Sequence, residues 1–250
     1  MKIIRFKAQD RTHWGILEAE HIRAVRLPNL EPTGQTFSSQ DVQLLVPAEP
    51  SKIVCVGKNY AAHAAEMGGE VPPEPGLFLK APNTLAQHGE TVAYPAWTDN
   101  FHFEGELGLV IKTRAHKISQ AEALGYVLGY TCAIDLTARD KQRSDLQWFR
   151  AKSADQFLPF GPHLETNLDP SQSHITTRIN GQVHQDSPTN KMIYSVPFVI
   201  SYVSQFMTLE AGDVIITGTP DGVGPLAVGD RLELTVAGVG VLAVSIGAKA

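Results

Sequence analysis

Residues 101–111 (Phe-His-Phe-Glu-Gly-Glu-Leu-Gly-Leu-Val-Ile) are the feature that most constrains what this chain can fold into. The segment opens with alternating polar and apolar residues and closes in an apolar run, which predicts a strand that enters a core. Side chains two apart share one face of a strand, so Glu104 and Glu106 are roughly 6–7 Å apart along it. Two carboxylates among apolar residues are costly to bury unless a cation neutralises them. The sequence leaves open a basic side chain, a hard divalent cation bound through oxygen, or a polar face in solvent.

The many turn-forming residues narrow the fold class. In 250 residues the chain has 21 Gly and 16 Pro, which indicates short strands joined by turns. We predict a mainly β fold with a few helices, of the α+β class. Residues 1–48 are expected to form a small, β-rich N-terminal domain, and residues 49–250 a catalytic domain. A polar stretch, residues 31–40, precedes the boundary between them.

Charge and hydropathy exclude several function classes. A formal net charge of −5 and the lack of a Lys/Arg run give no support to nucleic-acid binding. No apolar run approaches the roughly 18 residues of a membrane span, so no membrane partner is expected. Cys55 and Cys132 lie in apolar, strand-like contexts and are predicted to be reduced core residues. The expected location is cytoplasmic.

An Ala-rich segment, residues 59–67, predicts a short helix that ends at two glycines. On this helix His63 and Glu66 are i,i+3 neighbours and can form a hydrogen bond. A carboxylate against an imidazole raises its basicity and fixes its tautomer, as in a base that activates water. The alternative is a surface histidine with an incidental glutamate.

A third oxygen ligand is available at Asp135, which directly follows a nearly all-apolar predicted strand. Carboxylate ligands alone favour Mg²⁺ or Mn²⁺, with Ca²⁺ as a third candidate. His102 alternates onto the same face as the glutamates, and an imidazole ligand would favour Zn²⁺ or Fe²⁺ instead.

Three basic side chains lie near these segments. Arg139 suits bidentate binding of a carboxylate, and equally a structural ion pair with Asp140 or Asp145. Lys152 would stabilise an enolate or oxyanion beside a metal, or would face solvent. Lys80 is predicted to be a surface lysine whose stem lies along apolar residues.

Residues 209–224 predict a strand followed by a glycine-rich loop. Neither a Gly-Lys-Ser/Thr sequence nor a helix follows the glycines, so the loop matches no nucleotide-binding fingerprint. Its backbone and its Thr217 and Thr219 hydroxyls suit a small anionic ligand. Upstream, Asn180-Gly181 predicts a β-hairpin.

Six ordered blocks together resemble the fumarylacetoacetate hydrolase family, over about residues 51–245. The chain is most similar to its short members, which are acylpyruvases, oxaloacetate decarboxylases, and isomerases and decarboxylases of aromatic-acid degradation. The blocks are residues 57–66, 103–107, 129–139, 152–155, 161–162 and 217–224.

The resemblance implies a mixed β-sandwich roll, a homodimer and a bound Mg²⁺ or Mn²⁺. It also implies a His-Glu dyad on a lid, an active-site lysine and a loop that contacts the substrate. One departure is Ile134, which stands where the family usually has Asn and removes a hydrogen bond behind the metal ligand. The implied metal ligands are Glu104, Glu106 and Asp135, the catalytic residues His63, Glu66 and Lys152, and the substrate contacts Arg139, Gln142, Gly218 and Thr219.

The resemblance implies metal-dependent cleavage of the C–C bond next to a small 2-oxo acid, through a metal-stabilised enolate. For an acylpyruvate, His63 and Glu66 would activate water and release pyruvate and a carboxylic acid. For oxaloacetate, the same enolate would form by loss of CO₂. The two dyad residues favour hydrolysis. An isomerase of the 2-hydroxyhepta-2,4-diene-1,7-dioate type and a non-catalytic binding homologue are the alternatives.

Overall fold

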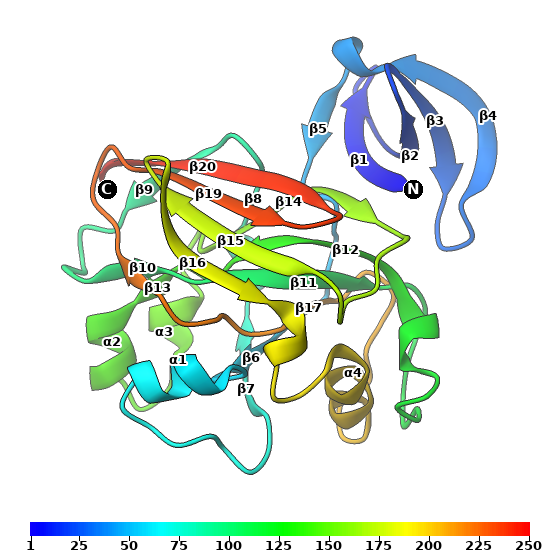
Figure 1. Cartoon of the computed structure of the whole chain (residues 1–250). Coiled ribbons are helices and arrows are strands. Elements are labelled where there is room, and N and C mark those ends of the chain that lie inside the picture. The colour runs from blue at the N-terminus through cyan, green and yellow to red at the C-terminus, as the bar shows by residue number, and fades with distance from the viewer.

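The N-terminal segment forms a small β unit beside a larger β body (Figure 1), in a computed structural model that describes residues 1–250. Strand β1 joins the two, because it pairs with β2 and β5 of the unit and its first residues pair with β14 of the body. The strands of the unit are β1 (Lys2–Ala8), β2 (Arg11–Glu18), β3 (His21–Arg26), β4 (Glu31–Ser38) and β5 (Gln43–Leu45).

The larger body consists of β-sheets with four short helices at its periphery. Strand β6 runs parallel to β17 and β9 parallel to β20, whereas most other neighbours are antiparallel. The predicted mainly β, mixed-sheet architecture is therefore confirmed. The largest sheet continues from β1–β5 through the β1–β14 pair. Its strands in the body are β6 (Ile53–Gly57), β7 (Gly76–Lys80), β8 (Leu85–Ala86), β11 (Gly105–Ile111), β12 (Val127–Ile134), β14 (Leu158–Glu165) and β17 (Val214–Ile216). The second holds β9 (Thr91–Tyr94), β15 (His174–Ile179), β16 (Gln182–Pro188), β19 (Arg231–Val236) and β20 (Gly240–Lys249). A small third sheet holds β10 (Phe101–Phe103), β13 (Thr137–Ala138) and β18 (Gly224–Pro225), and the helices are α1 (Ala61–Glu66), α2 (Arg139–Ser144), α3 (Phe149–Lys152) and α4 (Val196–Ser204).

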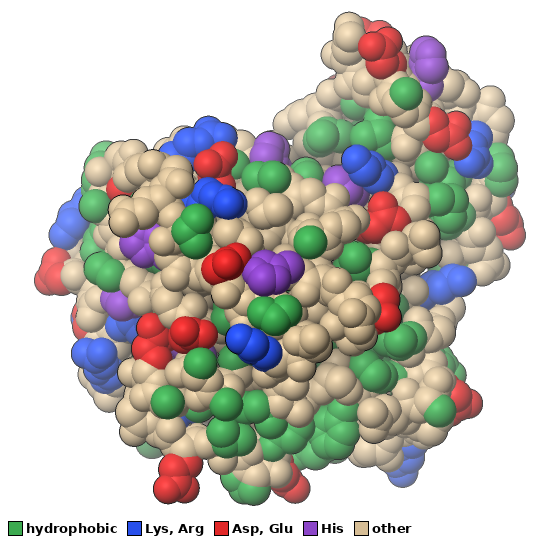
Figure 2. Space-filling model, in the orientation of Figure 1, with side chains coloured by type: hydrophobic (Ala, Val, Ile, Leu, Met, Phe, Trp, Pro, Cys, Tyr) green, Lys and Arg blue, Asp and Glu red, His purple; other side chains and the backbone are tan.

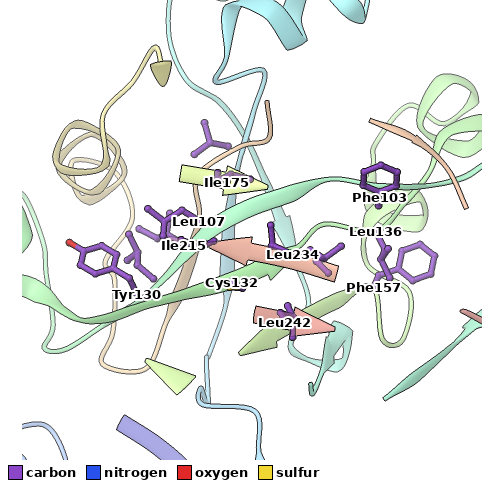
Figure 3. Packing of buried hydrophobic residues seen from close by; sticks show 14 of the residues in the cluster. Phe103, Leu107, Tyr130, Cys132, Leu136, Phe157, Ile175, Ile215, Leu234 and Leu242 are labelled. Carbon is purple, nitrogen blue, oxygen red and sulfur yellow. The ribbon is translucent and has the colours of Figure 1, made fainter. Parts of the chain in front are cut away.

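The main hydrophobic core lies between the two larger sheets, where β12 and β14 face β19 and β20. Figure 3 shows Leu107 and Cys132 from one sheet near Leu234 and Leu242 from the other, and all four are fully buried. Each such aliphatic side chain contributes about 2 kcal/mol by leaving water. Both cysteines are free and buried, as predicted.

Two local predictions have different outcomes. The Asn180-Gly181 hairpin is confirmed, because both residues have positive φ (52° and 83°) between β15 and β16. The single strand expected over residues 101–111 is instead two strands that separate at Glu104. The reason is that β10 pairs with β13 and β18 whereas β11 pairs with β12 and β17, so the chain changes sheets there.

The outer surface carries mixed charge. On the face in Figure 2, basic and acidic side chains are interspersed without a large area of one sign. No helix has both the length and the apolar character needed to cross a membrane.

Candidate active site

Three buried carboxylates meet where the chain passes from β10 to β11 and where β12 ends. Gly105 lies opposite Ile134 in the β11–β12 pair, so Glu104 and Asp135 are brought side by side. The Asp135 N–H donates to the Glu104 carbonyl at 2.8 Å. One carboxylate oxygen from each of Glu104, Glu106 and Asp135 lies within 4.8 Å of the others. The structure thus brings together the three residues predicted to bind metal.

Two lysines reach this cluster from neighbouring elements. Lys152 Nζ lies 2.8 Å from Glu104 Oε2 and 2.6 Å from Asp135 Oδ2. Lys80 Nζ lies 2.6 Å from Asp135 Oδ1, and the side chain is 1% exposed. The prediction of a surface role for Lys80 is therefore wrong, because the last residue of β7 points to the cluster rather than to solvent.

Arg139, the first residue of α2, is buried and forms an ion pair with Glu104. It also donates to Gln142 Oε1 at 2.7 Å. Its structural partner is therefore neither Asp140 nor Asp145.

The basic side chains pair with Glu104 and Asp135 but not with Glu106. Burial alone would raise the pKa of Glu104, but the positive charges of Arg139 and Lys152 hold it well below its usual range. Burial and repulsion by Asp135 and Glu104 raise the pKa of Glu106 well above its usual range. Its hydrogen-bond partner is the Gly218 N–H, at 2.7 Å.

This imbalance fits a divalent cation. A cation among the three oxygens would neutralise Glu106, which no basic side chain pairs with. Because the donors are all carboxylates, the residues present suit a hard ion such as Mg²⁺ or Mn²⁺, with Ca²⁺ also compatible. His102 lies outside the carboxylate cluster.

A cavity of about 210 Å³ opens beside the carboxylates. His63 on α1 lines it and is 4% exposed, so the surface interpretation of this histidine is wrong. His63 Nδ1 lies 3.1 Å from Glu66 Oε2, and Glu66 Oε1 accepts the Gly222 N–H at 3.0 Å. The glycine-rich loop thus binds the second oxygen of Glu66, while the first orients the His63 ring.

Most of the other predicted site residues share this cavity. Glu104, Arg139, Gln142, Lys152 and Thr219 line its wall. The other predicted residues are not among its lining: Glu66, Glu106, Asp135 and Gly218. The Gly218 N–H binds Glu106 instead.

Three polar residues of the site region were missed from the sequence. Lys58 and Arg143 line the cavity, and Gln185 is buried behind Thr219. Helical spacing could have revealed Arg143, which is i,i+4 to Arg139. No local pattern distinguishes Gln185 from other polar strand residues.

Two sequence profiles match this chain, one over each part of it. The sequence profile described as fumarylacetoacetate (FAA) hydrolase C-terminal matches residues 52–246, and an Rv2993c-like N-terminal profile matches residues 1–47. The oxaloacetate tautomerase YisK of Bacillus subtilis is 40% identical over 235 residues, which cover 88% of this chain and 78% of that protein.

Solved structures are also similar. The 5-carboxymethyl-2-hydroxymuconate delta-isomerase of Mycobacterium smegmatis is 38% identical with a TM-score of 0.93, and the match covers 100% of both chains. The fumarylpyruvate hydrolase of Pseudomonas aeruginosa, solved with Mn²⁺ and pyruvate, is 32% identical with a TM-score of 0.77 and is matched over 83% of this chain and 92% of that one.

Proposed function

Because this chain belongs to the fumarylacetoacetate hydrolase family, we propose that it is a metal-dependent enzyme that interconverts the keto and enol forms of oxaloacetate. The observation that carries this proposal is that one small cavity is lined by Glu104, Lys152 and the buried His63, whose Nδ1 lies 3.1 Å from Glu66 Oε2. A relative 40% identical to this chain is named for the same reaction.

The reaction requires that a proton leave the carbon next to the 2-oxo group. A bound divalent cation would polarise the 2-oxo oxygen as a Lewis acid. His63 presents its second ring nitrogen as the proton acceptor, since Nδ1 is directed at Glu66. The Glu66 carboxylate stabilises the imidazolium that results. Lys152 adds positive charge where the enolate oxygen develops. The enol forms when that oxygen takes up a proton from solvent and the His63 imidazolium returns its proton to solvent.

The cavity also carries cations that suit a second carboxylate. Lys58 and Arg143 line it, and neither forms an ion pair with a protein carboxylate. Lys58 holds a left-handed backbone (φ 55°), a conformation that costs about 1–3 kcal/mol and is concentrated at functional sites. Its Nζ approaches Gly69 and lies 2.6 Å from where a Cβ on that residue would be. These charges favour a dianionic substrate.

Replacing Arg143 by Gln is expected to raise the KM for oxaloacetate about tenfold with kcat nearly unchanged, the size of one charge-assisted hydrogen bond. Steady-state kinetics at saturating Mn²⁺ measure this. Arg11→Gln, exposed in the N-terminal unit, is the matched control. An unchanged KM would remove Arg143 from substrate binding.

Cleavage of a C–C bond is the second candidate function. The relative solved with pyruvate is named a fumarylpyruvate hydrolase, and a proton-accepting His63 would serve equally to activate water. The homodimer implied by the family resemblance stays a prediction.

The test starts from purified, metal-stripped protein. Enol oxaloacetate is followed by its ultraviolet absorbance with and without Mn²⁺, against Mn²⁺ alone, while pyruvate is assayed from oxaloacetate and from acetylpyruvate. Metal-dependent loss of the enol without pyruvate supports the tautomerase. Pyruvate from acetylpyruvate would assign a hydrolase, and pyruvate from oxaloacetate alone a decarboxylase. If neither loss of the enol nor release of pyruvate is observed, this substrate class is rejected.

A further inference from the structure

Gln185, in the middle of β16, is fully buried and uses both ends of its amide. Its Oε1 accepts the Gly105 N–H at 2.9 Å. Its Nε2 donates to Thr219 Oγ1 at 2.7 Å and to the Pro220 carbonyl at 2.9 Å. It is not among the residues that line the cavity, so it acts through its neighbours.

These bonds close into a ring. Thr219 Oγ1 donates to the Gly105 carbonyl at 3.0 Å, so both backbone groups of Gly105 are tied to the pair formed by Gln185 and Thr219. Gly105 is the residue between Glu104 and Glu106. A Cβ there would lie 2.1 Å from Thr177 Oγ1 and 3.0 Å from Gln185 Oε1, so the backbone fits closely against β15 and β16. The ring therefore links the backbone between Glu104 and Glu106 directly to the glycine-rich loop.

The ring also determines which hydrogen-bonding groups of Thr219 remain available to a ligand. Its hydroxyl proton is donated to Gly105, and its oxygen accepts from Gln185. Its backbone N–H makes no hydrogen bond within the protein, although the residue is 2% exposed and lines the cavity. An anionic ligand would satisfy this buried N–H.

We propose that Gln185 is a positioning residue, which fixes the Thr219 N–H relative to Gly105 and so to the two carboxylates on either side of it, Glu104 and Glu106. The substrate half of this inference rests on the proposed function, and the metal half does not. Groups that orient metal ligands from behind affect metal affinity or activity by about 10–100-fold.

The first variant is Gln185→Met, which keeps a similar length and removes all three hydrogen bonds. We expect the Kd for Mn²⁺ and the KM for oxaloacetate each to rise about tenfold. Calorimetry gives the Mn²⁺ affinity of the full chain, at a temperature where circular dichroism shows it folded. Thr177→Val is the matched control, since Thr177 Oγ1 is buried beside Gly105 without a hydrogen-bond partner.

The second variant, Thr219→Val, opens the ring at its other corner and leaves β16 intact. It is expected to weaken Mn²⁺ binding as well, and the double variant to lose less than the sum of the two single losses, since the residues act as one unit. Native Mn²⁺ affinity in either variant, or losses that only follow the unfolded fraction, would overturn the proposal. If the native protein does not act on oxaloacetate, the Mn²⁺ measurements still decide the role of Gln185, so the two failures are distinguishable.

Discussion

Glu106→Gln is expected to abolish high-affinity metal binding and to lower the metal-dependent activity about 1000-fold. A metal that acts as a Lewis acid supplies several kcal/mol of transition-state stabilisation, and each 1.4 kcal/mol or so is tenfold in rate. The glutamine side chain keeps the shape and can still accept the Gly218 N–H, which lies 2.7 Å from Glu106 Oε2. The change therefore removes the charge and leaves the packing.

The same variant is expected to lose metal binding but not thermal stability in the absence of metal. In the metal-free protein Glu106 is a buried carboxylate without a basic partner, which is a destabilising arrangement. Metal-free Glu106→Gln should therefore melt at or above the temperature of the native protein, whereas added Mn²⁺ should raise the melting temperature of the native protein only.

Melting curves with and without Mn²⁺, together with calorimetric titration, measure both effects. Glu20→Gln, at an exposed turn of the N-terminal unit, is the matched control. Tight Mn²⁺ binding by Glu106→Gln would mean that the metal site is elsewhere.

His63→Ala is expected to lower the rate of proton transfer about 100- to 10,000-fold, the usual contribution of a positioned general base. Because His63 is not one of the three clustered carboxylates, Mn²⁺ affinity should remain close to native. This contrast separates loss of the base from loss of the metal.

Enol oxaloacetate and acetylpyruvate are both assayed with this variant, at saturating Mn²⁺. Loss on both substrates is the expected result, because the same ring nitrogen serves either reaction. If acetylpyruvate cleavage continued near the native rate, activation of water by His63 would be wrong. His21→Ala, exposed at the start of β3, is the control.

Local patterns were sufficient where the governing interaction is local. Asn180-Gly181 specified its own hairpin because both residues accept positive φ. The carboxylates of Glu104 and Glu106 do meet as expected, although Glu104 lies between β10 and β11 and not within one strand. Strand β4 (Glu31–Ser38) was not predicted, because residues 31–40 were recognised only as a polar stretch. It is an end strand with mostly exposed side chains, so it has no apolar alternation to recognise.

The sequence by itself determined the family, the mainly β class and the carboxylate, His and Lys residue types of the site. Only the tertiary structure decided that Lys80 is buried against Asp135, that Arg139 pairs with Glu104, and that Gln185 closes a ring behind the loop. These contacts join segments that are 34 to 114 residues apart in the chain. Whether a charged or amide side chain meets solvent or a buried partner depends on which strands become neighbours, and no spacing within one segment contains that information.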